Sequence, residues 1–316
     1  MTHAHPHGDG QPAPASRRVV LALAAVMSVL LLATVVALVV LWPKAGELPA
    51  KRSVFYEGAV PVSGTVERIV DPGDVATGQP GKIAVTLDDA GDEVLVDMGP
   101  SLVDDNIVGA RVRLVRGPVD LTGEPVYSYM DFHRSWPLIG LGIAFVVVVV
   151  AVARLKGLAA LGGLAGALAL VWFFTLPALL AGRHGLAVAL TTASAVLFIV
   201  VYLAHGVSVK STTALLGTFA GVAAVTSLAA WAIPGAHLTP IVRDDLAQLP
   251  YIAPGIHVTG VLLCGMVLGG VGVLNDVTIT QASSVWELRA AAPTDSRRRV
   301  FARAMRIGRD HIASTV

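Results

Sequence analysis

Residues 136–153 have the sequence WPLIGLGIAFVVVVVAVA, and residues 157–182 continue as GLAALGGLAGALALVWFFTLPALLAG. Neither stretch contains Asp, Glu, Lys or Arg, and a helix needs about 20 mostly apolar residues to cross a bilayer. The basic residues Arg154 and Lys156 stand between the two stretches. The pattern therefore predicts two membrane spans joined by a short basic turn.

Four further segments have the same character, which makes about six predicted transmembrane helices. They are residues 19–42, 185–204, 212–233 and 255–274. The composition agrees, because 54% of the residues are hydrophobic, only 14% are charged, and the mean hydropathy is +0.71. A soluble domain carries about 25% charged residues. The predicted fold class is therefore an α-helical polytopic membrane protein.

The first apolar segment is interpreted as an uncleaved anchor. A signal peptide has an apolar core of about 7–15 residues and a small-residue cleavage site after it. Residues 19–42 are longer than such a core, and no such site follows them. The single cysteine, Cys264, lies in the last apolar segment, so the chain has no intrachain disulfide.

Lysine and arginine set the predicted orientation, because short cytoplasmic loops carry an excess of them. If each segment crosses once, Arg154, Lys156, Lys210 and both ends of the chain lie on the basic side, whereas the opposite short loops hold only Arg183 and Arg243. We therefore expect a cytoplasmic N-terminus. The predicted parts are a disordered tail (1–18), an anchor (19–42), an extracytoplasmic β domain (43–135), five spans (136–274) and a cytoplasmic segment (275–316).

The extracytoplasmic segment has the period of strands. Apolar residues alternate in 82–88 and 93–98, and the sequence DDAGD at 88–92 is typical of a hairpin turn. Further strands are predicted at 64–70, 110–116 and 126–129, with Gly, Pro and Asp between them. Five short strands in about 80 residues predict a small closed β-barrel, OB-like or SH3-like.

The charge of this domain argues against a nucleic-acid partner. Residues 51–133 contain 7 Lys and Arg against 14 Asp and Glu, a net charge of −7. Binding of single strands needs a basic groove with exposed aromatic side chains. A solvated acidic surface is the simplest interpretation, and contact with a cation or a protein is the alternative.

Sequence motifs of catalysis are missing. The chain contains no Gly-x-x-x-x-Gly-Lys-Ser/Thr loop, no His-Glu-x-x-His and no Gly-x-Ser-x-Gly. We therefore expect no enzymatic activity, no cofactor and no metal centre. His3, His5 and His7 are interpreted as part of an unstructured tail, with weak metal binding as the alternative.

Small residues recur at a spacing of four in the apolar segments. In lipid, glycine lets helix backbones approach closely. We interpret these positions as helix-packing sites, and a substrate path lined by backbone is the alternative. The pairs are Gly162 and Gly166, Gly217 and Gly221, and Gly265 and Gly269.

A polar cluster follows the last apolar segment and is the sharpest candidate site. It consists of Asn275, Asp276, Thr278, Thr280 and Gln281. An acid beside carbonyl and hydroxyl oxygens suits coordination of a cation or relay of a proton, and polar residues at membrane depth are often functional. The alternative is a cap that satisfies the backbone where the helix ends.

The last segment predicts a basic amphipathic helix. Val300, Ala304 and Ile312 share one face with other apolar residues. This pattern suits a helix on the cytoplasmic membrane surface, and binding of a regulatory partner is the alternative. The basic face consists of Arg299, Arg303, Arg306 and Arg309.

Four strings give the chain a family resemblance. They are residues 214–218 (ALLGT), 272–282 (GVLNDVTITQA), 285–288 (VWEL) and 307–315 (IGRDHIAST). They resemble the YibE/F family of multi-pass membrane proteins. The resemblance implies a bacterial plasma-membrane protein, loosely described as a permease. Similar members continue past the last string with further spans, so we expect this chain to be truncated.

Two functions follow as expectations. The first is a transporter-like protein of unknown substrate with its pathway near the last three spans. The second is a non-transporting scaffold or sensor that binds a partner through its acidic extracytoplasmic domain. The expected partners are the lipid bilayer and either a second copy of the chain or another membrane protein.

Overall fold

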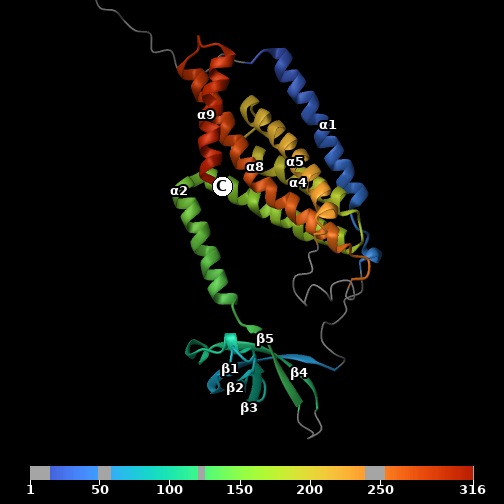
Figure 1. Ribbon diagram of the computed structural model, residues 1–316, viewed down its shortest axis with the longest axis vertical. Coiled ribbons are helices and arrows are strands. Elements are labelled where there is room, and N and C mark those ends of the chain that lie inside the picture. Colours follow the sequence, from blue (N-terminus) through green and yellow to red (C-terminus); the bar gives the residue numbers. More distant parts are fainter. Residues whose placement is uncertain (1–14, 49–57, 120–124, 239–252, 316) are drawn as a thin grey trace, which may run out of the picture. The chain divides into compact units, whose positions relative to one another are not determined.

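The computed structural model describes residues 15–48, 58–119, 125–238 and 253–315. The chain separates into two compact units, residues 51–148 and residues 1–50 together with 149–316 (Figure 1). We treat each unit by itself. The predicted N-terminal tail falls almost entirely outside the described residues, and so do His3, His5 and His7.

Residues 60–132 form a closed barrel of five strands, as the sequence predicts. The strands pair in the order β1-β2-β3-β5-β4, and β4 closes on β1. All pairs are antiparallel except β3 with β5, which meet in parallel at Asp97 and Ser128. The strands are β1 (Val60–Asp71), β2 (Gly81–Leu87), β3 (Glu93–Met98), β4 (Arg111–Val119) and β5 (Pro125–Phe132).

The barrel core contains the faces that the alternation predicts. Ile83, Val85 and Leu87 from β2 are almost completely buried, together with Val96 and Met98 from β3. The predicted turn joins these strands, and the Leu87 N–H donates to the Asp92 carbonyl at 3.0 Å. Arg68 pairs with Glu93 and Arg111 pairs with Asp88 on the exposed surface, so part of the acidic charge is locally compensated.

Within the described residues, five helices are long and apolar enough to cross a membrane. Two of the predicted spans lie in a single run of 46 residues, Ser135–Leu180. The individual helices are α1 (Arg17–Leu41), α2 (Ser135–Leu170), the π-helical turn η4 (Val171–Thr175), α3 (Leu176–Leu180), α4 (Gly185–His205), α5 (Val209–Gly235), α8 (Val258–Ala291) and α9 (Arg297–Thr315).

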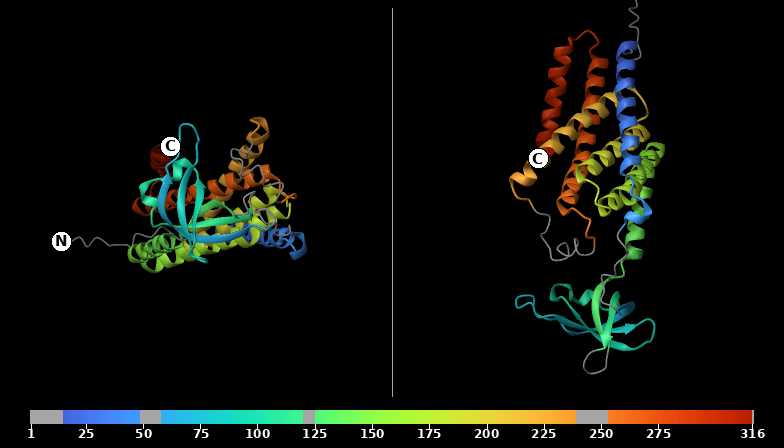
Figure 2. Two further views of the ribbon diagram at one scale, coloured as in Figure 1. Left: turned by 90° about the horizontal axis from the view of Figure 1, so that it is seen from below. Right: turned by 90° about the vertical axis from the view of Figure 1, so that its right-hand side faces the viewer.

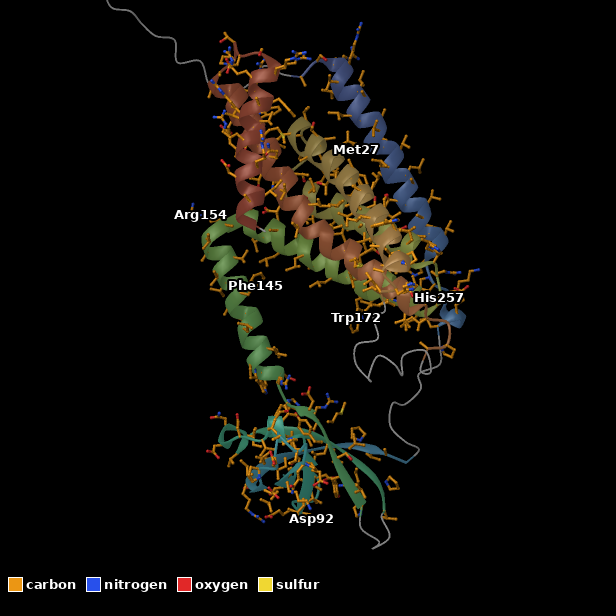
Figure 3. The ribbon with its side chains drawn as sticks, viewed as in Figure 1. Met27, Asp92, Phe145, Arg154, Trp172 and His257 are labelled. Atoms are coloured by element: carbon orange, nitrogen blue, oxygen red, sulfur yellow. The ribbon has the colours of Figure 1, made fainter. Side chains whose placement is uncertain are left out.

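The long run is broken where the sequence predicts the turn between two spans. Arg154 has φ 51° and ψ −130°, which is not helical (Figure 3). A straight helix of this length would measure about 69 Å, more than twice the hydrocarbon core of about 30 Å. The π turn precedes Pro177, whose missing N–H disturbs the regular hydrogen-bond ladder.

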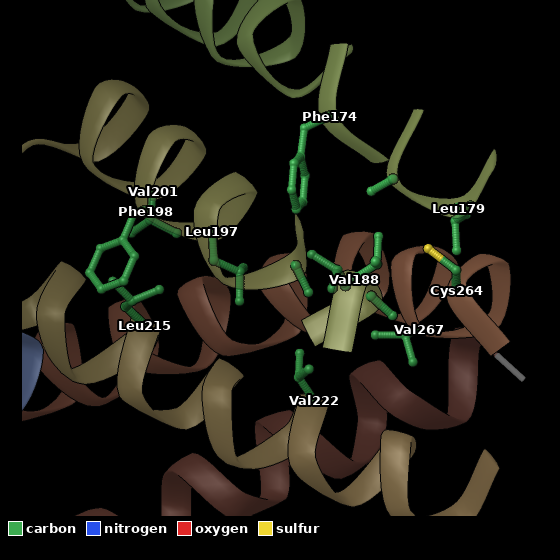
Figure 4. Close-up of a cluster of buried hydrophobic side chains, with 14 of the residues drawn as sticks. Phe174, Leu179, Val188, Leu197, Phe198, Val201, Leu215, Val222, Cys264 and Val267 are labelled. Atoms are coloured by element: carbon green, nitrogen blue, oxygen red, sulfur yellow. The ribbon is translucent and has the colours of Figure 1, made fainter. Parts of the chain in front are cut away.

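Helix α4 lies at the centre of the helical unit. Its side chains Val188, Leu197 and Val201 are almost completely buried, and Figure 4 shows them packed among residues of its neighbours, including Phe174 and Val267. Hydroxyl pairs add to this packing. Thr34 of α1 bonds Ser194 of α4, and Thr175 of η4 bonds Thr192 of α4 at 2.8 Å.

Glycine sets the closest approach between helices. A Cβ on Gly185 of α4 would lie 2.4 Å from the Cα of Gly260 in α8, so the two backbones touch. Gly162, Gly166 and Gly221 also lie at helix contacts, where a Cβ would be within 3.1–3.3 Å of Leu203, Ile199 and Leu274 respectively. Gly217 faces Thr278 at an ordinary 3.7 Å.

Gly265 and Gly269 occupy a different face of α8. A Cβ at either position would meet no heavy atom within 4 Å in the described part of the chain. The inward face of α8 carries Cys264, Val267 and Val271 instead, which are buried. Spacing therefore identifies small residues but does not tell which of them face a neighbouring helix.

The Gly185 contact predicts a large effect of a single methyl group. Gly185→Ala should lower the thermal midpoint of the purified full chain in detergent, because the new Cβ meets backbone that cannot move aside, at a cost of about 1–3 kcal/mol. Gly265→Ala is the matched control in α8. It should leave the midpoint unchanged or raise it, since Ala favours helix over Gly by about 1 kcal/mol. Equal midpoints for the two variants would contradict the contact.

Candidate functional site at the ends of three helices

A pocket of about 730 Å³ lies where α4 begins, α5 ends and α8 begins. Pockets that bind small molecules typically measure about 300–1,000 Å³. The wall consists mainly of apolar side chains, among them Leu186, Ile233 and Leu263. Its polar side chains among the described residues are the imidazoles of His184, His237 and His257 and the hydroxyl of Thr259.

His184 and His257 occupy equivalent positions at two helix starts. Each is the N-cap residue of its helix, His184 of α4 and His257 of α8, and neither side chain makes a capping hydrogen bond. Both side chains are exposed at the helix ends (Figure 3 labels His257). Their imidazoles are therefore not used to hold their own helices, and the N-terminal ends of both helices carry partial positive charge toward the pocket.

His237 enters the pocket from the end of α5. Its φ of 48° is left-handed, and the next N–H, of Leu238, donates to the Ile233 carbonyl at 3.0 Å. This pattern is a Schellman ending, in which the left-handed position is usually glycine. A left-handed non-glycine residue costs about 1–2 kcal/mol. The helix therefore ends on a strained histidine, although Gly235 stands two residues earlier.

Glycines form the floor of the pocket. Gly185 and Gly260, whose backbones touch, both line it. Beside them, Gly182 has φ +74° and a Cβ there would lie 2.8 Å from the Gly255 carbonyl oxygen. The turn before α4 and the turn before α8 are thus packed backbone against backbone. The close packing holds the two N-cap histidines at neighbouring helix ends.

An ion pair lies beside this region, next to the turn before α4. Arg183 donates to Glu47 at 2.7 Å, which ties the turn before α4 to the short helix η1 (Ala45–Glu47) after α1. The backbone N–H of Lys44, together with the Arg183 guanidinium, holds the pKa of the Glu47 carboxyl below its usual range. Trp42 and Phe174, with ring centroids 5.6 Å apart, strengthen the same connection.

The predicted polar cluster is distributed over different faces of α8. The helix runs on to Ala291, so Asp276 lies in its interior and does not cap its end. Asp276 and Thr280 are exposed on one face, whereas Thr278 bonds the buried Thr218 of α5. The Asn275 Oδ1 is buried and has no partner among the described residues. The five side chains therefore do not form one ligand shell.

Gln281 and the basic helix belong to a helical hairpin. The Gln281 side chain donates to the Ala304 carbonyl of α9 at 2.7 Å, and Gly308 packs against the same side chain. Val300 and Ala304 are buried, so α9 packs lengthwise and antiparallel on the end of α8 (Figure 2). Of the predicted apolar face, Phe301, with 66% of its surface exposed, points away from α8.

Two of the four predicted surface arginines brace the turn of this hairpin. Arg299 and Arg303 both contact Asp295, at 2.9 and 2.8 Å, and Asp295 is only 12% exposed. Arg306 and Arg309 are exposed. The contact of the four arginines with lipid stays a prediction. The packing shows that α9 lies against α8.

Sequence reasoning indicated only one member of the histidine pocket, because His257 lies near the start of the predicted span 255–274 at membrane depth. His184 and His237 lie in the loops between predicted spans that face the same side. The reason that the sequence did not bring them together is distance along the chain, since 73 positions separate the first from the last.

Five long apolar helices and a closed barrel define the chain as a membrane protein with an added β domain. A family described as YibE/F-like protein matches residues 141–316. The chain therefore belongs to the YibE/F family, as the sequence resemblance predicted. No curated protein and no solved structure matches the chain.

The hydroxyl pair between α5 and α8 gives a test of the interior role of the cluster. Thr278→Val removes its bond to Thr218 and should lower the thermal midpoint of the full chain, at a cost of about 0.6–1.7 kcal/mol. Thr280→Val is the same change on the exposed face two residues later and should have no measurable effect. If Thr280→Val proves the more damaging, the assignment of faces is wrong.

Proposed function

We propose that the chain is a membrane permease whose pathway opens at the pocket between α4, α5 and α8. The observation that supports it is the pocket itself, since ligand sites between helices are typically concave, apolar and furnished with a few polar groups. Such sites in transporters often use helix N-termini. No side chains interlock where Gly185 meets Gly260, so this contact would let α4 and α8 slide against each other.

The proposed orientation places this pocket on the extracytoplasmic side. The bias of Lys and Arg supports a cytoplasmic N-terminus. The barrel is then also extracytoplasmic. Its strand order, with a parallel contact between β3 and β5, supports an OB-like barrel. Helix α8, at 34 residues, is about 51 Å long, so its end and the hairpin would project into the cytoplasm.

The orientation can be tested by labelling with a membrane-impermeant thiol reagent on intact cells. In a Cys264→Ala background, Ala76→Cys in the exposed β1–β2 loop should label, whereas Thr294→Cys in the turn before α9 should label only after permeabilisation. Both positions are exposed, so burial does not explain a difference. The reverse pattern would invert the proposed topology.

The permease proposal can be tested by filling the pocket. A strain without the gene should differ from the wild type in the distribution of at least one solute between cells and medium, measured by metabolite profiling. The wild-type gene should restore the distribution. Thr259→Trp, which places an indole in the pocket, should not. Val273→Trp on the exposed side of α8 is the control and should restore it.

A non-transporting sensor or scaffold is the second candidate. Its support is the acidic barrel, whose net charge of −7 suits a basic partner. This candidate predicts that Thr259→Trp restores every solute as well as the wild type does. Rescue by Thr259→Trp would therefore end the permease proposal and favour the barrel as the functional part. Membrane-protein partners, including a second copy of the chain, remain part of this second candidate.

A further inference from the structure

We propose that the histidine-lined pocket binds a small organic anion, namely a carboxylate with an apolar body. The inference deepens the permease proposal, because it names the class of solute that the permease would carry. It rests on that proposal only for the claim that the bound molecule is transported. The binding itself is a separate property of the pocket. The features that carry it are the three imidazoles from three helices around one cavity.

The charge character of the described residues that line the pocket favours an anion over a cation as ligand. The described lining residues contain no Asp or Glu, and the titratable ones are His184, His237 and His257. The nearest described charged pair, Arg183 with Glu47, is internally compensated. Imidazole N–H groups donate hydrogen bonds, and the N-terminal ends of α4 and α8 add partial positive charge, so the described lining suits a ligand with negative charge.

The size and lining of the pocket select an organic anion over a bare ion. The cavity of about 730 Å³ is far larger than one ion needs, and Leu186, Ile233 and Leu263 offer an apolar wall. In the part of the chain that the structure describes, no three His, Cys, Asp or Glu side chains lie close enough to hold a metal ion. A carboxylate that meets imidazoles while its carbon skeleton lies on the wall satisfies both observations.

The strained ending of α5 is consistent with this use of His237. Its left-handed φ of 48° would be relaxed in glycine. Histidine at this position supplies an imidazole to the pocket, which glycine would not. Backbone strain of this kind often occurs at ligand sites.

Saturation-transfer NMR with benzoate on the full chain in nanodiscs tests the inference. We expect saturation transfer to benzoate from the wild-type chain, because the imidazoles offer hydrogen-bond donors to the carboxylate and the apolar wall contacts the ring. His184→Gln combined with His257→Gln should weaken binding on the order of tenfold. His205→Gln, at the other end of α4, is the control and should leave binding unchanged.

His237→Gly separates a structural role from a ligand role. It should preserve or raise the thermal midpoint, because glycine relaxes the left-handed position, and it should nevertheless weaken benzoate binding. Equal binding by the wild type and the double glutamine variant would overturn the proposal. So would binding of inorganic phosphate without binding of benzoate. Either result leaves the permease proposal to the Thr259→Trp test, which does not depend on the class of solute.

Discussion

The contact between the backbones of Gly185 and Gly260 is the constraint on which the helical unit depends. Lipid tails are as apolar as leucine, so helices in a bilayer gain little by hiding apolar side chains from lipid. They associate through close packing and interhelical hydrogen bonds instead. A Cβ added at Gly185 would lie only 2.4 Å from the Cα of Gly260. This contact therefore sets how closely α4 and α8 approach and where their N-cap histidines lie.

Hydrogen bonds between hydroxyl groups of neighbouring helices add to the packing that the glycine contact allows. Thr192 and Ser194 of α4 bond Thr175 and Thr34 respectively, so the central helix is tied on two sides. The connections of α1 concentrate in its second half and just beyond it, at Thr34, Trp42 and Glu47. Trp42 and Glu47 lie next to the turn before α4, whereas the Thr34–Ser194 bond lies midway along α4. The bond between Thr218 and Thr278 lies toward the start of α5, away from the pocket. The polar contacts therefore stabilise the packing along the length of the helical unit and are not confined to the pocket end.

The sequence predicted the parts whose physics is local. Alternation predicted β2 and β3, because one face of each must be buried in the barrel, and the Gly, Pro and Asp residues between strands helped to place the other three. Apolar length gave the helices, and the break at Arg154 falls where two charged residues interrupt the run. The alternative of a cap just after Leu274 was wrong, because apolar character stops there whereas the helix continues to Ala291 and is supported by packing against α9. Six spans were predicted and five long apolar helices are found among the described residues, because the predicted spans 136–153 and 157–182 lie in one run that is broken at Arg154.

The candidate site could not be predicted to the same depth, because it forms where the ends of three helices come together and the sequence does not show which helix ends meet. His184, His237 and His257 each look like ordinary interfacial histidines in sequence. Alternating topology would have placed them on one side, but only the glycine contact brings α4 and α8 together at that side, and only the left-handed ending of α5 introduces the third imidazole. The chemistry of the pocket therefore depends on three backbone features: two glycines that permit contact, and one histidine held where glycine would be easier.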